Sequence, residues 1–148
     1  MKKIICFLLA VLLSLSLISC EAEGDAYSML SEFIAAYGAE GVIYSPSIPE
    51  GKDGYVSDGL IERAFVFSGR FPESYAIFLN SHTSGQYECG IFVCSDAEEL
   101  RCAEECALER VRLLGGKKGF VKRRGRVVYY STMADRERAE RIFDEIIR

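Results

Sequence analysis

The sequence predicts an α+β domain in which helices pack against one face of a four-stranded antiparallel sheet. Three observations lead to this fold class. An apolar pattern with helical spacing occupies residues 26–37, and the order strand, strand, helix occurs twice between residue 74 and the C-terminus. Clusters of Gly, Pro, Asn and Ser separate these segments. Together the segments form one predicted domain over residues 26–148.

The N-terminal element is a helix expected over Ala26–Tyr37, because its large apolar side chains recur three, three, one and three residues apart. Asp25 can cap the start of this helix and Gly38 can end it. The passage that follows, residues 39–54, is rich in Gly and Pro and is expected to be irregular. A short second helix is expected over residues 59–65, with Asp58 as its cap.

The first strand–strand–helix unit begins with two segments rich in aromatic and β-branched residues, 74–79 and 87–94. Residues 80–85 between them are turn formers, so the two strands are expected to pair as an antiparallel hairpin. His82, the only histidine of the chain, lies in this turn.

The helix of this unit is expected over residues 96–114, where Ser95 and Glu98 match a capping box and two glycines follow the last turn. One stripe of this helix is apolar and is expected to face the sheet; it comprises Leu100, Ala103, Ala107, Val111 and Leu114. Cys102 and Cys106 lie well round from that stripe, so we expect either that the N-terminal helix covers them or that they pair.

The second unit repeats the order of elements, although the residues themselves do not match. Strands are expected at 119–122 and 127–130, joined by a tight turn at Arg124-Gly125. Thr132 can cap a last amphipathic helix over residues 133–147. The two units give the predicted sheet its four strands.

The first twenty residues are typical of a bacterial export signal that ends in a lipidated cysteine. A basic head precedes an apolar run of about 16 residues, which is at or below the length of a membrane-spanning helix. Leu17-Ile18-Ser19-Cys20 resembles the lipobox of bacterial lipoproteins, in which lipid is attached to the cysteine sulfur and a peptidase then cleaves before it. The cleavage site is therefore predicted between Ser19 and Cys20. An uncleaved membrane anchor and a signal peptide cut elsewhere are the alternatives.

This motif predicts where the protein is located. Residues 1–19 are the predicted signal peptide, residues 20–25 a lipidated tether, and Cys20 the lipidation site that holds the chain to the extracytoplasmic face of the cell membrane. Only a thiol can be alkylated to the stable thioether that such anchoring requires. Because each buried CH₂ contributes about 0.8 kcal/mol, a diacylglyceryl group, with palmitate-like chains, anchors durably where one chain would not.

Length and charge exclude some classes of function. Removal of residues 1–19 leaves 129 residues, enough for one domain with its own core but too few for a two-lobed solute receptor. The chain has 18 Lys and Arg against 22 Asp and Glu, and the loss of Lys2 and Lys3 with the signal makes the mature net charge −6. This balance, together with export, argues against nucleic acid as a partner.

Four cysteines remain in the mature chain besides the lipidated one. Export permits disulfides, so the even number suggests buried thiols or a disulfide, with three pairings left open among Cys89, Cys94, Cys102 and Cys106. A metal site is disfavoured because no CxxC pair is present and the one histidine lies in a turn. We therefore expect no metal and no cofactor.

No catalytic constellation stands out, so whether the protein is an enzyme stays open. Nothing in the sequence pairs the only histidine with a particular nucleophile. Most acidic residues cluster on the outer faces of predicted helices, where they are expected to be solvated. The alternative to a binding protein is a small envelope enzyme or thiol-redox protein that uses the four mature-chain cysteines.

Six basic residues gather within ten positions around the second predicted hairpin: Lys117, Lys118, Lys122, Arg123, Arg124 and Arg126. Basic side chains near an anionic leaflet gain about 1 kcal/mol each, and anionic wall polymers would attract them similarly. The alternative is a solvated turn whose flanking strands carry charged side chains that prevent edge-to-edge pairing with other chains.

Three segments and the closing helix resemble a family of small lipoproteins from Gram-positive, mainly clostridial, bacteria that is known only as a domain of unknown function. The segments are residues 75–79, 91–99 and 127–130. The resemblance spans roughly residue 55 to the C-terminus and implies the lipoprotein location and a mixed α/β domain, without catalytic residues. We expect a lipid-anchored binding or accessory module that contacts the membrane and either an anionic lipid, a wall polymer or an envelope protein.

Overall fold

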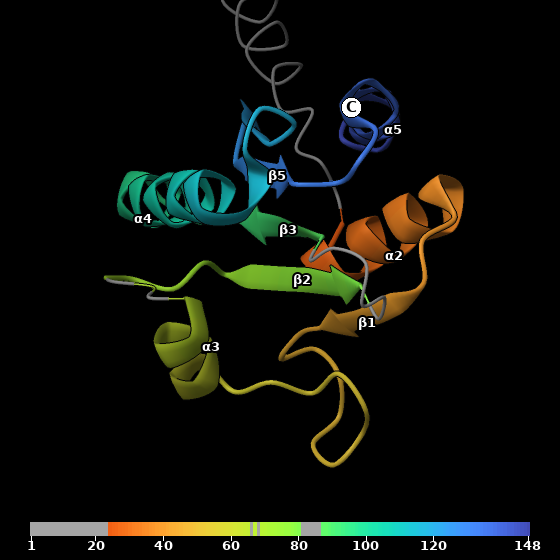
Figure 1. Ribbon diagram of the computed structural model, residues 1–148. Coiled ribbons are helices and arrows are strands. Elements are labelled where there is room, and N and C mark those ends of the chain that lie inside the picture. Colours follow the sequence, from red (N-terminus) through yellow and green to blue (C-terminus); the bar gives the residue numbers. More distant parts are fainter. Residues whose placement is uncertain (1–23, 66, 68, 81–86) are drawn as a thin grey trace, which may run out of the picture.

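The structure is a computed structural model that describes residues 24–65, 67, 69–80 and 87–148. The predicted signal peptide, Ser19, Cys20, most of the tether and His82 lie outside the described residues. Within them, four α-helices and one five-stranded sheet form the domain (Figure 1). The α+β class and the antiparallel sheet are confirmed. No helix in the described part has the length and hydropathy of a membrane span.

All strand pairs in the sheet are antiparallel, and the strand order is β1-β2-β3-β5-β4. The strands are β1 (Gly41–Tyr44), β2 (Ser74–Asn80), β3 (Glu88–Val93), β4 (Phe120–Arg124) and β5 (Val127–Ser131). The prediction of four strands was wrong by one, because β1 lies in the passage expected to be irregular. Its Val-Ile-Tyr segment is short, and pairing with β2 extends the sheet by one edge strand.

The helices are α2 (Ala26–Tyr37), α3 (Asp58–Phe65), α4 (Ala97–Arg110) and α5 (Arg136–Ile146), with a π-helical turn, η1 (Val111–Gly115), directly after α4. The bounds of α2 are as predicted, whereas α3 begins one residue early, so Asp58, predicted as its cap, lies in its first turn. Asp25 accepts a hydrogen bond from the backbone N–H of Ser28 at 3.0 Å, and Gly38 ends α2 in the left-handed conformation, with φ 72°.

Two further predicted caps were wrong. The side chain of Asp96, not Ser95, caps α4, and it is the carboxylate of Glu99, not Glu98, that bonds back to Ser95. Thr132 caps no helix, because its hydroxyl bonds to the backbone of Glu88 and prolongs the pairing of β5 with β3. Helix α5 begins at Arg136, and the side chain of Asp135 caps it. In both helices the residue that caps is an aspartate that follows the predicted cap, by one position in α4 and by three in α5.

Helices cover both faces of the sheet, whereas the sequence predicted one face. Helices α2 and α5 pack on one face, and α3 and α4 on the other (Figure 1). Side chains of β2 alternate between the two clusters: Ala76 and Phe78 lie on the α2 and α5 face, while Tyr75 and Ile77 lie on the α3 and α4 face. Strand β5 is buried along its whole length. A continuous apolar run in a strand indicates that both of its faces are buried, whereas alternation of apolar and polar residues indicates a sheet covered on one face only.

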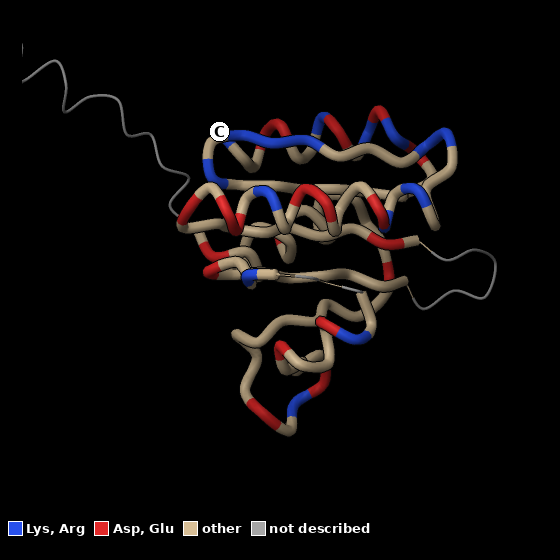
Figure 2. Tube along the Cα trace, turned by 90° about the vertical axis from the view of Figure 1, so that its left-hand side faces the viewer, with Lys and Arg blue, Asp and Glu red and all other residues tan. Residues whose placement is uncertain are grey.

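We name the two ends of the sheet by the place where the chain enters the domain. At the first, called the entry end, the backbone N–H of Ala26 donates to Ser74 Oγ at 3.0 Å, and Ser74 pairs with Val93. Helices α2 and α4 begin there and α5 finishes there, and the C-terminus lies at this end too (left in Figure 2). The opposite end, called the far end, contains the end of β2 and the start of β3. These two ends give the site its orientation.

Candidate functional site

The four mature-chain cysteines are free thiols and all are buried. Cys89 belongs to the cluster on the α2 and α5 face of the sheet, whereas the other three, Cys94, Cys102 and Cys106, belong to the cluster on the α3 and α4 face. A disulfide from Cys89 to any of the others would have to cross the sheet, so none of the three complete pairings of the four cysteines is compatible with the fold.

Cys102 and Cys106 are in the core, contrary to the expectation that they lie round from the buried stripe of their helix. The cover comes from α3 and the residues after it, not from the N-terminal helix. Cys106 Sγ donates to the carbonyl of Phe65 at 3.9 Å. Gly69 packs so closely on Cys102 that a Cβ there would lie 2.6 Å from the sulfur. Leu100 of the predicted stripe is only half-buried.

Burial makes three of these thiols poor nucleophiles. It raises the pKa of both Cys94 and Cys106 to about 12, and it raises the pKa of Cys89 well above its usual value. The positive charge of Arg110 lowers the pKa of Cys106 but does not outweigh the loss of solvation. Since the thiolate is the reactive species, these residues lack the activation that catalytic cysteines share.

Thiol counting tests this arrangement. In the native domain, residues 24–148, we expect no cysteine to react rapidly with a thiol reagent, and all four to react after denaturation without reductant. A count below four in the denatured, unreduced domain would indicate a disulfide. A pair that re-forms and opens under mild reductant would instead favour the thiol-redox alternative.

The basic residues around the second hairpin are separated by the fold. Lys122 bridges Glu140 at 3.1 Å and Asp144 at 3.2 Å on α5. Arg124 donates to the backbone carbonyls of Asp144, at 3.3 Å, and Ile147. These contacts tie β4 to the C-terminal helix. Both side chains therefore hold the domain together as well as carrying charge.

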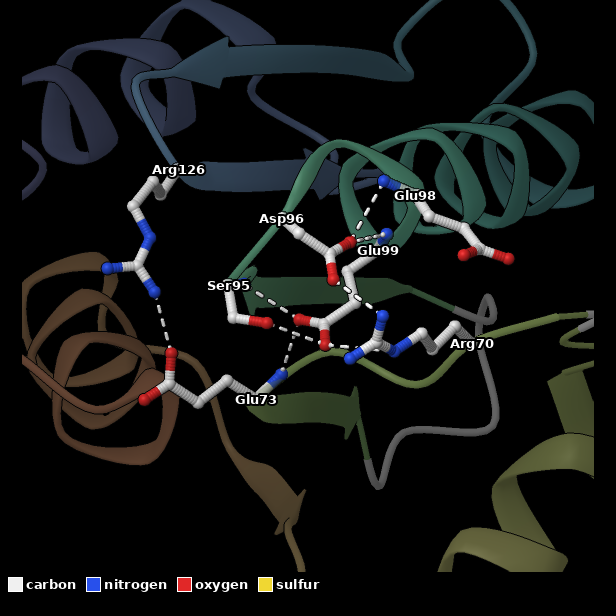
Figure 3. Close-up of polar contacts among 7 residues, drawn as sticks. All are labelled: Arg70, Glu73, Ser95, Asp96, Glu98, Glu99 and Arg126. Carbon is white, nitrogen blue, oxygen red and sulfur yellow. Dashed lines mark hydrogen bonds and ion pairs between the residues drawn. The ribbon is translucent and has the colours of Figure 1, made fainter.

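Arg126 and Arg123 are likewise held by contacts within the domain. Arg126 Nε donates to the carbonyl of Cys94 at 2.6 Å, and another of its nitrogens lies 2.7 Å from Glu73 (Figure 3). Arg123 lies 3.6 Å from Glu104 on α4. The tight turn itself is Gly125-Arg126, one residue later than predicted, since Arg124 still pairs with Val127.

Figure 3 shows that the same end of the sheet carries a second polar network around Glu99. Its nearly buried carboxylate accepts hydrogen bonds from the backbone N–H groups of Ser95, at 2.7 Å, and Glu73, at 3.1 Å. Arg70 bridges Asp96 at 2.7 Å. These bonds connect the start of α4 to the residues before β2. The network therefore stabilises the packing of these two segments at the entry end.

Lys117 and Lys118, in contrast, are exposed at the other end of β4, beside Gly119 and close to the start of that strand. Arg124 pairs with Val127 at the entry end, while Phe120 pairs with Ser131 at the far end. The six basic residues consequently do not form one continuous surface. The predicted anionic-surface cluster divides into two lysines at the far end and four side chains that make contacts inside the domain.

Sequence reasoning missed a buried ion pair on the α4 face. Glu88 is fully buried, and Arg110 holds its carboxylate through two hydrogen bonds of 2.8 and 2.6 Å. The hydroxyl of Tyr130 donates to the same carboxylate at 2.5 Å. Opposite Tyr130 stands Gly90, where a Cβ would lie 2.5 Å from the tyrosine ring. A charge at the start of a strand gives no sequence signal that it is buried, so this cluster could not be predicted.

The far end also carries an open groove of about 430 Å³ on the α2 and α5 side of the sheet. Its walls are the end of α2, the residues after it, the two ends of the β2–β3 pair, and the residues after β5. The lining residues are Tyr37, Gly38, Ala39, Glu40, Asn80, Tyr87, Met133 and Ala134. Neither the cysteine pattern nor the charge pattern pointed to it, because its residues come from four separate stretches.

The chemistry of the groove is mixed. Two tyrosines and a methionine give it apolar surface, and Glu40 and Asn80 give it polar atoms. Asn80 Oδ1 accepts a hydrogen bond from the backbone N–H of Tyr87 at 2.9 Å. The hydroxyl oxygen of Tyr37 accepts one from the backbone N–H of Asp135 at 3.1 Å. These bonds fix the walls. A concave surface of this size, apolar with a few polar groups, is the usual form of a ligand site.

Comparison of the chain with protein-family models, with curated proteins and with solved structures finds no match. The resemblance to clostridial lipoproteins therefore stays a prediction. Across the described part of the chain, no three His, Cys, Asp or Glu side chains are arranged to hold a metal ion.

Proposed function

We propose that this chain is a lipid-anchored, extracytoplasmic protein that acts as a binding or accessory module at the cell envelope, with the groove at its far end as the binding surface. The proposal is carried by the relation between the groove and the anchor. The lipobox-like motif predicts acylation at Cys20. The chain joins the domain at the entry end, while the groove lies at the opposite end.

The anchor explains why such an arrangement is useful. A groove at the entry end would face the membrane, whereas a groove at the far end faces away from it. It is therefore accessible to an envelope protein, a peptide or a wall component. The walls are built from a helix end and strand ends that are fixed by hydrogen bonds, so the groove is pre-formed, which lowers the ordering penalty of binding.

Ala134→Arg tests the groove. Ala134 is exposed and lines it, so a long charged side chain there obstructs the groove without entering the core. Chemical crosslinking in intact cells is expected to join the native protein to a neighbour, and Ala134→Arg is expected to lose that product. Ala35→Arg is the matched control, because Ala35 is an exposed alanine of α2 outside the groove lining.

Cys20→Ser completes the experiment. This variant cannot be acylated, so we expect it in the soluble extracellular fraction, while the native protein and both arginine variants remain with the membrane. If Cys20→Ser stayed equally membrane-bound, the lipid anchor would be disproved. If Ala134→Arg crosslinked as the native protein does, the groove would not be the binding surface.

A further inference from the structure

The direction in which the chain enters the domain has a consequence for how the protein sits on a membrane. Asp25 is fixed at the entry end, because it caps α2 and the next residue, Ala26, donates to Ser74. Five peptide units separate Cys20 from Asp25, and an extended chain of that length spans at most about 18 Å. An acylated Cys20 therefore keeps the entry end near the bilayer.

The domain is longer than this tether. Strand β2, with 7 residues, spans about 23 Å, and α4, with 14 residues, spans about 21 Å. For the far end to touch the membrane with the entry end pointing away, the tether would have to exceed the length of the domain. The inverted orientation is therefore excluded for the acylated protein, and only upright or sideways orientations remain.

Three exposed side chains at the entry end can contact lipid headgroups in the upright orientation. Tyr27, in the first turn of α2, is 37% exposed, and tyrosine is enriched at the level of lipid headgroups. Arg70 and Arg126 are also well exposed, but each is paired with an acidic neighbour, Asp96 and Glu73 respectively. This end also carries the acidic side chains of Asp25, Glu98 and Glu99, so an anionic leaflet does not attract it, and its contact with the bilayer depends on the short tether.

We propose that the entry end is a membrane-facing surface, in which Tyr27, Arg70 and Arg126 contact the phospholipid headgroups of the leaflet that carries the Cys20 acyl chains. The far end, with its groove, then projects away from the bilayer. This inference rests on the proposed lipid anchor and adds the surface that meets the membrane. Because the arginines are paired, the tether and not attraction to anionic lipid sets the orientation.

Fluorescence quenching on the acylated protein in vesicles tests the orientation. Glu98→Cys places a thiol-reactive fluorophore in the first turn of α4 at the entry end, and Lys118→Cys places one at the far end; both positions are exposed and the native thiols are buried. Nitroxide on the lipid headgroups is expected to quench the label at 98 strongly and to leave the label at 118 unquenched. The pattern should be the same in zwitterionic vesicles and in vesicles with phosphatidylglycerol.

Two results would overturn this inference while leaving the lipid anchor intact. Equal quenching at both positions, in protein that floats with the vesicles, would show a sideways domain. Quenching at 98 that occurs only with anionic lipid would show that charge, not the tether, sets the orientation. Failure of the native protein to float with the vesicles would instead disprove the anchor, and the membrane-facing surface with it.

Discussion

Arg110→Met is expected to destabilise the domain by about 3–5 kcal/mol, because it leaves the carboxylate of Glu88 buried without its cation. The side chain of Glu88 is 0% exposed and that of Arg110 14%, so water cannot replace the lost partner. The guanidinium also lies 4.6 Å from the centre of the Phe65 ring, a contact that joins α4 to α3. Urea unfolding followed by circular dichroism measures the change.

Two further variants make this result specific. Arg112→Met removes an exposed arginine paired with Glu109, and it is expected to leave the unfolding midpoint unchanged. Glu88→Gln added to Arg110→Met removes the uncompensated charge and is expected to restore part of the lost stability. The ion pair would not have the role assigned to it if Arg110→Met behaved like Arg112→Met.

Phe143→Ala is expected to cost about 3–5 kcal/mol, because it opens a cavity between α5, α2 and the sheet. Phe143 is fully buried and its ring stacks on Phe33, with centroids 3.9 Å apart, and lies 4.8 Å from the ring of Tyr129. These contacts join both helices of that face to β5. The same urea experiment measures the loss.

Ile142→Ala is the matched control for this cavity. Ile142 is the preceding residue of α5 and is only partly buried, so its truncation removes less contact. We expect a clearly smaller loss of stability for Ile142→Ala than for Phe143→Ala. Equal losses would mean that the helix itself, and not the aromatic contact with α2, determines the stability of this face.

The amino-acid sequence predicted elements whose signals are local. Helix α2 has its cap, its apolar spacing and its terminal glycine within fourteen residues; the cap and the glycine took the predicted roles, and Leu30 and Phe33 of the apolar pattern are buried, whereas Tyr27 is exposed. The paired strands β2 and β3 carry runs of aromatic and β-branched residues that favour extended structure in any context. The location at the membrane likewise depends on a contiguous motif that ends at Cys20, which stays a prediction.

Choices between neighbouring polar residues were less predictable. Asp135 caps α5 in place of Thr132, because the hydroxyl of Thr132 is taken by the backbone of Glu88 across the sheet. Strand β1 is four residues long and forms because β2 offers an unpaired edge. In both cases a contact with a residue distant in the sequence determined the local structure, and such a contact cannot be predicted from the neighbouring residues alone.

The sequence by itself determined the class of the fold, the helices with complete caps, and the motif that predicts lipidation. Only the tertiary structure decided that helices cover both faces of the sheet, that Glu88 is buried against Arg110, and that the basic residues near the second hairpin point to different partners. It also brought four separate stretches together as the groove. The physical reason is range: caps and periodicity act between residues a few positions apart, whereas burial and ion pairing depend on which distant segments the sheet brings into contact.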